Sequence, residues 1–175
     1  SRQIDYKAVA KKVKDADAII FVGGISSSLE GEEMGVKYPG FRNGDRTNID
    51  LPQVQKNMMK ALKETGKPVI FVLCSGSTMA LSWEDKNVDA IMEAWYLGTM
   101  AGYSIADVVS GAYNPSARLT MSFPRSVGQS PLYYNHKNTG RPIDPAAPKT
   151  DYRSFYIDEE NTPIYPFGYG LSYTT

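Results

Sequence analysis

The sequence predicts an α/β fold in which a mostly parallel sheet is covered by helices on both faces and followed by a long irregular C-terminal wrap. Two observations favour this class. Short apolar runs alternate with stretches of helical periodicity over residues 6–123. The apolar runs also lack polar alternation, as expected of strands that are buried on both faces of a parallel sheet.

Composition and charge limit the possible partners. The chain has 175 residues, enough for one domain with a core. Lys plus Arg and Asp plus Glu both number 19, so no strong field attracts nucleic acid or an anionic membrane. No apolar run approaches the roughly 20 residues that span a bilayer. One cysteine and one histidine cannot build a disulfide within the chain or a Cys/His metal centre. We therefore expect a neutral partner.

The first half of the chain predicts two helices and two strands. Apolar spacing indicates a short helix over residues 6–15, and the run at 18–22 predicts the first strand. A second helix begins at residues 51–52, because proline is tolerated in a first helical turn, where its missing N–H costs no hydrogen bond. Gly66 is placed to end that helix. Residues 68–74 then predict a second buried strand.

The second half changes character near its middle. We expect a third strand over residues 88–95, a helix over 103–109 and a short strand over 119–123. From residue 125 on, the chain holds more than half of its prolines and tyrosines and no convincing helix. The sequence therefore predicts an α/β core over residues 1–124. Residues 125–175 are expected to form an irregular segment that packs on this core or on a neighbouring domain.

A long loop between the first strand and the second helix is the most distinctive part of the chain. Residues 23–50 leave the strand through two glycines and then carry Glu30, Glu32 and Glu33 within four positions. Ordered excursions of this length are usually functional. In a parallel α/β sheet, ligands bind beyond the carboxyl ends of the strands. We expect the loops that follow the three strands to meet at that edge.

The acidic cluster supports several chemistries to different degrees. Crowded carboxylates repel one another, which favours uptake of a proton by one of them. A neutral carboxylic acid is what protonation of a glycosidic oxygen requires. The alternative interpretation of the three glutamates is a solvated acidic turn without a catalytic role. The loop lacks the G-x-G-x-x-G pattern and the Walker lysine that would indicate a nucleotide site. It also lacks the histidine and the EF-hand spacing that would indicate a metal site. We predict no metal and no cofactor.

Nine short blocks follow one another along the chain. They are residues 29–33 (LEGEE), 45–46 with 51–52 (DR and LP), 66–69 (GKPV), 89–96 with Gly98 (DAIMEAWY and G), 105–108 (IADV), 113–116 (YNPS), 122–129 (SFPRSVGQ), 131–135 (PLYYN) and 165–173 (YPFGYGLSY). In these blocks the chain resembles the C-terminal α/β sandwich domain of glycoside hydrolase family 3, the β-glucosidase and β-xylosidase family. The resemblance covers nearly the whole chain.

This resemblance implies a retaining β-glycosidase that hydrolyses terminal non-reducing β-linked sugars with two carboxyl groups. The nucleophile would be an aspartate on a preceding (β/α)8 barrel, which is absent from this chain. The acid/base would be a glutamate of the first long loop. Matching the family's loop favours Glu32, and Glu30 or Glu33 takes that role if the register differs. The chain alone is therefore expected to be an inactive part of a hydrolase.

The resemblance also implies supporting residues and partners. Asp45 and Arg46 would order the substrate loop by ion pairing and backbone contacts rather than touch sugar. The implied partners are a neutral oligosaccharide or glycoside and the barrel domain of the same enzyme, with no nucleic acid and no membrane. A periplasmic or secreted location is implied as well. The choice between glucoside and xyloside stays open. A non-catalytic carbohydrate-binding or scaffolding domain, and less so a nucleotide-binding domain, are the alternatives.

Overall fold

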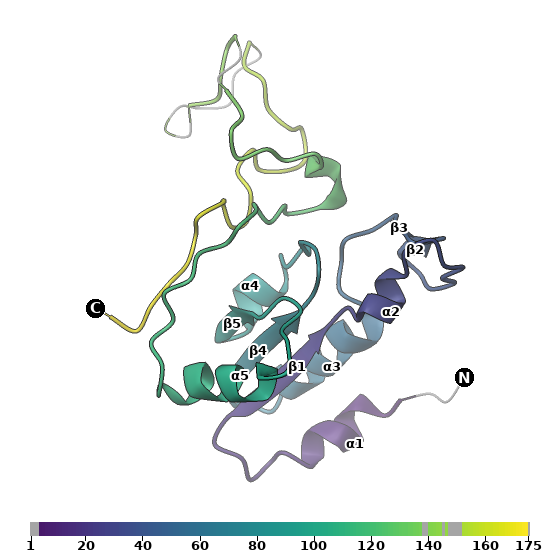
Figure 1. Cartoon of the computed structure of the whole chain (residues 1–175), viewed down its shortest axis with the longest axis vertical. Helices are drawn as coiled ribbons and strands as arrows, with labels where there is room; N and C mark the ends of the chain where they lie inside the picture. The colour runs from purple at the N-terminus through teal and green to yellow at the C-terminus, as the bar shows by residue number, and fades with distance from the viewer. Residues whose placement is uncertain (1–3, 138–139, 145, 147–151, 175) are drawn as a thin grey trace.

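A three-stranded parallel sheet forms the centre of the chain (Figure 1). The structure, a computed structural model, describes residues 4–137, 140–144, 146 and 152–174. The strands β1 (Ile19–Gly24), β4 (Val69–Cys74) and β5 (Ala90–Glu93) lie in the order β1-β4-β5. Their register pairs Gly24 with Cys74 and Leu73 with Glu93, so the three carboxyl ends share one edge. The predicted α/β fold class is confirmed.

Helices α1 (Tyr6–Lys11) and α3 (Gln53–Lys63) cover one face of the sheet. Ala10 of α1 and Leu62 of α3 pack with Ile19 and Val69 in one buried cluster. A larger cluster lies toward the carboxyl ends of the strands and contains Ile25, Leu51, Met59, Phe71, Leu73, Met79, Leu81 and Phe123. Burying each large side chain contributes roughly 1.5–3 kcal/mol. This core fixes the strand ends from which the loops leave.

Helix α5 (Ala101–Ser110) lies over the opposite face, where its Ile105 lines an open pocket together with Cys74. This cover is uneven. Val72 of the central strand is fully buried, as predicted for a strand covered on both faces. In β1, however, Ile20 and Val22 are 53% and 60% exposed. The prediction of a doubly buried first strand therefore fails on this face, because β1 is the edge strand and α5 stands over its neighbours.

The long loop contains short elements that the sequence did not predict. Helix α2 (Ser27–Glu30) begins where Ser26 Oγ accepts a hydrogen bond from the Leu29 N–H, and it ends at Gly31 in a left-handed conformation. A hairpin of β2 (Phe41–Arg42) and β3 (Asp45–Arg46) follows. Its turn places Asn43 and Gly44 at φ values of 54° and 97°, the residue types that tight hairpin turns favour.

Other boundaries differ modestly from the predictions. The first helix ends at Lys11 instead of residue 15, and α5 begins two residues earlier than predicted. The third strand is shorter than predicted, although the N–H groups of Asp89 and Ala94 on either side of it still donate to carbonyls of β4. The Asp89 side chain accepts a hydrogen bond from the Val69 N–H, and Trp95 adopts a φ of 53°. A further short helix, α4 (Glu84–Asn87), precedes it.

The chain after α5 is irregular in the described residues, apart from one 3-10 turn at Val127–Gln129, and extends away from the sheet (Figure 1). The strand predicted over residues 119–123 does not form. Instead, the chain bends at residues 120–121. The Leu119 N–H donates to the Tyr169 carbonyl and the Phe123 N–H to the Tyr165 carbonyl, both at 2.8 Å. None of the helices in the described ranges is long and apolar enough to cross a membrane.

Candidate active site

The carboxyl edge of the sheet brings the acidic loop together with the loops after β4 and β5, as predicted. Ser77 Oγ, which follows β4, donates to Glu30 Oε1 at 3.0 Å. Tyr96 Oη, which follows β5, donates to the Ile25 carbonyl at 2.6 Å. Burial, together with the nearby, negatively charged Glu30 carboxylate, raises the pKa of Tyr96 to about 12. The acidic loop is thus anchored on either side of α2.

The first turn of the acidic loop is held from α3. Gln55 Nε2 donates to the Gly24 carbonyl at 2.7 Å, and the Gly24 N–H donates back to Gln55 Oε1 at 2.8 Å. Gly24 adopts a φ of 130°, and a Cβ at this position would overlap the Cys74 carbonyl. Only glycine fits here, because the two parallel strand ends approach so closely. The exit of the loop from β1 is therefore rigid.

The three predicted glutamates occupy different environments. Glu30 is half-buried and faces Ser77, whereas Glu32 and Glu33 are exposed in the turn that follows α2. Glu33 adopts a φ of 49°, which is uncommon for a residue with a side chain. The hairpin backs this turn, since a side chain at Gly44 would collide with the Gly31 carbonyl. The loop therefore presents one anchored carboxylate and two that reach solvent.

Arg46 braces the far side of the acidic loop. Its Nε donates to the Asn48 carbonyl at 2.9 Å, and its guanidinium lies 4.8 Å from the centre of the Phe41 ring. Partial burial lowers the pKa of Arg46, although the nearby charge of Glu30 acts in the opposite direction. Asp45 pairs through its backbone with the first strand of the hairpin and is exposed. No ion pair in the described part of the chain involves Asp45.

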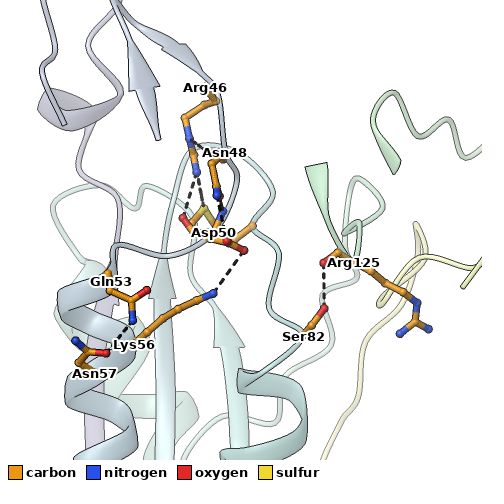
Figure 2. A network of polar contacts seen from close by, with 9 residues as sticks. Arg46, Asn48, Asp50, Gln53, Lys56, Asn57, Ser82 and Arg125 are labelled. Atoms are coloured by element: carbon orange, nitrogen blue, oxygen red, sulfur yellow. Dashed lines mark hydrogen bonds and ion pairs between the residues drawn. The ribbon is translucent and has the colours of Figure 1, made fainter. Parts of the chain in front are cut away.

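The end of the loop is tied to α3 and to the neighbouring loops. Asp50 Oδ1 lies 3.5 Å from Lys56 Nζ, and Asp50 Oδ2 accepts a hydrogen bond from Asn48 Nδ2 at 3.2 Å (Figure 2). Ser82, which follows β4, donates to the Arg125 carbonyl at 3.0 Å and so joins this region to the C-terminal segment (Figure 2). These contacts hold the long loop in one ordered conformation.

The sequence analysis missed two carboxyl groups with buried oxygen atoms, on the half-buried Glu93 and the fully buried Glu84. Glu93 ends β5, where its Oε1 accepts a hydrogen bond from the Trp95 N–H at 2.8 Å while its Oε2 has no partner among the described residues. Burial raises the pKa of Glu93 to about 8, and the hydrogen bond from the Trp95 N–H and the nearby Ser75 side chain only partly oppose it. In α4, Glu84 is fully buried without a hydrogen bond from the described residues, and burial raises its pKa.

A signal for Glu93 was present in the sequence. A single charged residue near the end of an otherwise apolar strand must be buried or must mark the strand's exit toward the functional edge. No group of three or more His, Cys, Asp or Glu side chains within the described ranges is arranged to hold a metal ion. Glu32 and Glu33 face solvent from the turn after α2, and exposed carboxyl groups of this kind can exchange protons.

A parallel α/β sheet with an ordered acidic loop at its carboxyl edge defines the class of this chain as an α/β sandwich domain. The chain belongs to glycoside hydrolase family 3, because the model of the "Glycosyl hydrolase family 3 C-terminal domain" matches residues 3–173. The family predicted from the nine sequence blocks is thereby confirmed.

Relatives and solved structures agree with this family. The chain is 51% identical over 162 residues to a periplasmic beta-glucosidase of Salmonella typhimurium, covering 93% of this chain and 20% of the relative. It is 46% identical over 172 residues to a xylan 1,4-beta-xylosidase of Xylanibacter ruminicola, covering 98% and 18%. A beta-glucosidase structure from Listeria innocua in complex with gluconolactone superposes with a TM-score of 0.86 at 37% identity, covering 99% and 23%. The chain thus spans about a fifth of these relatives' length.

Proposed function

We propose that this chain is the domain of a retaining β-glycosidase that supplies the acid/base glutamate for hydrolysis of terminal non-reducing β-linked sugars. The observation that carries the proposal is the exposed acidic turn, which directly follows a segment held by hydrogen bonds from the loops after β4 and β5. Relatives named beta-glucosidase and beta-xylosidase support a neutral glycoside as the substrate. They leave glucosides and xylosides as equal candidates.

The proposed reaction needs a second carboxylate from outside this chain. An aspartate on a (β/α)8 barrel of the same enzyme attacks the anomeric carbon and forms a glycosyl-enzyme intermediate. The glutamate of this domain protonates the departing glycosidic oxygen and then, as a base, activates the water that releases the sugar. A carboxyl group that becomes buried at a domain interface also keeps its proton to higher pH, which suits the first step.

Glu32 is our preferred acid/base. Its exposed side chain is free to reach across to a neighbouring domain, whereas Glu30 is half-buried and already accepts a hydrogen bond from Ser77. Glu33 is exposed as well and is the alternative if the family register shifts by one residue. The hydrogen bonds and ring contact of Arg46 support a role for Asp45 and Arg46 in ordering the loop instead of binding sugar.

The division of the chain and its location are further parts of the proposal. We place an α/β core at residues 1–124 and a packing segment at 125–175. The hydrogen bonds from Ser82 to the Arg125 carbonyl and from Tyr165 to Asp85 support packing of this segment on the core. A periplasmic or secreted location is supported by the name of the Salmonella relative. We propose that the domain needs no nucleic-acid partner, no membrane partner and no cofactor.

Substitution of Glu32 by Gln in the complete enzyme that contains this chain tests the assignment. Loss of general acid/base catalysis typically costs about 10²–10⁴-fold in rate. We expect such a loss of kcat/KM on alkyl glycosides, whose leaving groups need a proton. Activated aryl glycosides should lose much less in the glycosylation step, and added azide should partly restore turnover by replacing the base-activated water.

Two matched variants serve as controls for the Glu32→Gln result. Glu30→Gln and Glu33→Gln remove the same charge from the same loop, so only the acid/base position should show both the leaving-group dependence and the azide response. If Glu30→Gln or Glu33→Gln shows them instead, the register is wrong. If all three variants stay active, the loop is not catalytic and the domain is a binding or scaffolding module. The 175-residue chain alone should hydrolyse neither substrate.

A further inference from the structure

We propose that Glu93 is a positioning residue for the acidic loop, because its carboxyl group holds the Trp95–Tyr96 turn and lies beside Ser75 of the loop after β4, and these two loops together anchor both sides of α2. Glu93 itself lies at the end of β5 and does not belong to the acidic loop. The effect on catalysis rests on the proposed function. The anchoring of the loop does not, and it can be measured separately.

The first connection runs through the backbone after β5. Glu93 Oε1 accepts a hydrogen bond from the N–H of Trp95, two residues later, at 2.8 Å. Trp95 adopts a φ of 53°, a left-handed conformation that is unfavourable for a bulky residue and persists only where surrounding contacts enforce it. The turn sends Tyr96 toward β1, where its hydroxyl donates to the Ile25 carbonyl at 2.6 Å. Glu93 thereby helps to fix the first residue of the acidic loop.

The second connection runs through the loop after β4. The Ser75 side chain is fully buried beside the Glu93 carboxyl group, and its presence lowers the pKa of Glu93 against the larger effect of burial. Ser75 Oγ donates its proton to the Ser77 carbonyl at 2.9 Å, and Ser77 Oγ donates to Glu30 Oε1 at 3.0 Å. Glu93 is therefore linked to the last residue of α2 as well.

The three loops interlock at Gly76. A side chain there would come within 2.6 Å of the Tyr96 ring and 2.8 Å of Glu30 Oε2. The Tyr96 ring and the Glu30 carboxylate thus both lie close to the side of Gly76 on which a side chain would stand. This close packing brings the loops after β4 and β5 together at the end of α2. A change at Glu93 should therefore reach α2.

The surroundings of Glu93 are suited to a structural carboxyl group. Its Oε2 lacks a partner in the described part of the chain, and no salt bridge found there involves it. Cys74 lies nearby at the end of β4. Burial raises the pKa of its thiol, and the charge of Glu93 raises it further. An uncharged carboxyl group fits this environment best.

Hydrogen–deuterium exchange of the 175-residue chain tests the anchoring without any assay of activity. Glu93→Ala should make the amides of Ile25 and α2 exchange about fivefold faster or more, the effect of losing one net hydrogen bond. Glu93→Gln should stay close to wild type, since its amide oxygen can accept the same N–H. Tyr96→Phe removes one hydroxyl group and should accelerate the same amides.

Glu84→Ala is the matched control, because it also removes a buried carboxyl group but lies in α4. It should leave exchange of α2 unchanged. Equal acceleration by Glu84→Ala and Glu93→Ala would mean general loosening and would overturn the proposal, as would unchanged exchange in both Glu93→Ala and Tyr96→Phe. If Glu93→Ala does not fold, Glu93→Asp is used, because the shorter side chain cannot reach the Trp95 N–H.

The catalytic part is measured in the complete enzyme. A displaced proton donor should cost about tenfold to a hundredfold in kcat on alkyl glycosides, with less than about threefold on activated aryl glycosides and KM nearly unchanged. Equal losses on both substrates would refute a positioning role in catalysis. Faster exchange combined with unchanged kinetics would leave the anchoring intact and count against the acidic loop as the acid/base.

Discussion

Replacing Glu93 by Gln should flatten the dependence of stability on pH. Burial raises the pKa of Glu93 from its ordinary 4.5 to about 8 in the folded chain. Between these two values the folded chain holds one proton more than the unfolded chain at this site. The free energy of unfolding therefore falls as pH rises, and it falls by about 1.4 kcal/mol per pH unit while the folded carboxyl stays protonated.

The size of the effect follows from these two values. From pH 6 to pH 8 the contribution of Glu93 should reduce the free energy of unfolding by about 2 kcal/mol, because the folded carboxyl is half-ionised at the upper limit. Gln carries no charge at any pH and accepts the same hydrogen bond from Trp95. The variant should therefore match the wild type near pH 5 and exceed it in stability at pH 8.

Urea unfolding followed by circular dichroism at pH 5, 6, 7 and 8 measures this difference. Burial also raises the pKa of Glu84, so the wild-type chain has a second source of pH dependence with the same sign. That contribution is common to both proteins and cancels in the comparison. If the two curves stay parallel within about 0.5 kcal/mol from pH 5 to pH 8, Glu93 is not a buried, protonated carboxyl group and the reasoning fails.

Two further predictions concern the rigid exit from β1. Gly24→Ala should destabilise the chain by about 3 kcal/mol or more, because its Cβ would overlap the Cys74 carbonyl. At Gly66, which also has a positive φ but has open space around it, the same change should cost only about 1–2 kcal/mol; similar values at both sites would contradict the close approach. Gln55→Ala should lose about 2 kcal/mol in urea unfolding and Gln53→Ala less than about 0.5, since Gln55 alone bonds both polar groups of Gly24. A larger loss at Gln53 would show that this hydrogen-bond pair contributes little.

The differences between prediction and structure have physical causes in particular residues. The sequence predicted β1 as doubly buried from its apolar residues alone, yet Ile20 and Val22 are exposed because coverage depends on where α5 lies over the sheet. It predicted a strand at 119–123 from β-forming residues. Leu119 and Phe123 exchange separate hydrogen bonds with residues 164–169 instead of forming a strand, because bends interrupt the pairing.

The candidate site divides in the same way. Local pattern placed Glu30, Glu32 and Glu33 on one loop at the carboxyl edge, since the direction of the first strand determines where its loop emerges. It could not distinguish among them. That distinction comes from Ser77, which is 47 residues away along the chain and holds Glu30. The local pattern also did not identify Glu93, because the burial of a single carboxyl group depends on which residues pack around it.

The sequence by itself determined the α/β class and the family. Apolar periodicity and the order of the nine blocks are properties of the chain that need no knowledge of contacts. Only the tertiary structure decided that Glu30 is anchored and that Glu32 and Glu33 face outward. It also decided that carboxyl oxygens of Glu84 and Glu93 are buried. Those outcomes depend on contacts between residues far apart, such as Tyr96 and Ile25, separated by 71 positions, and no local pattern encodes the distance between two strand ends.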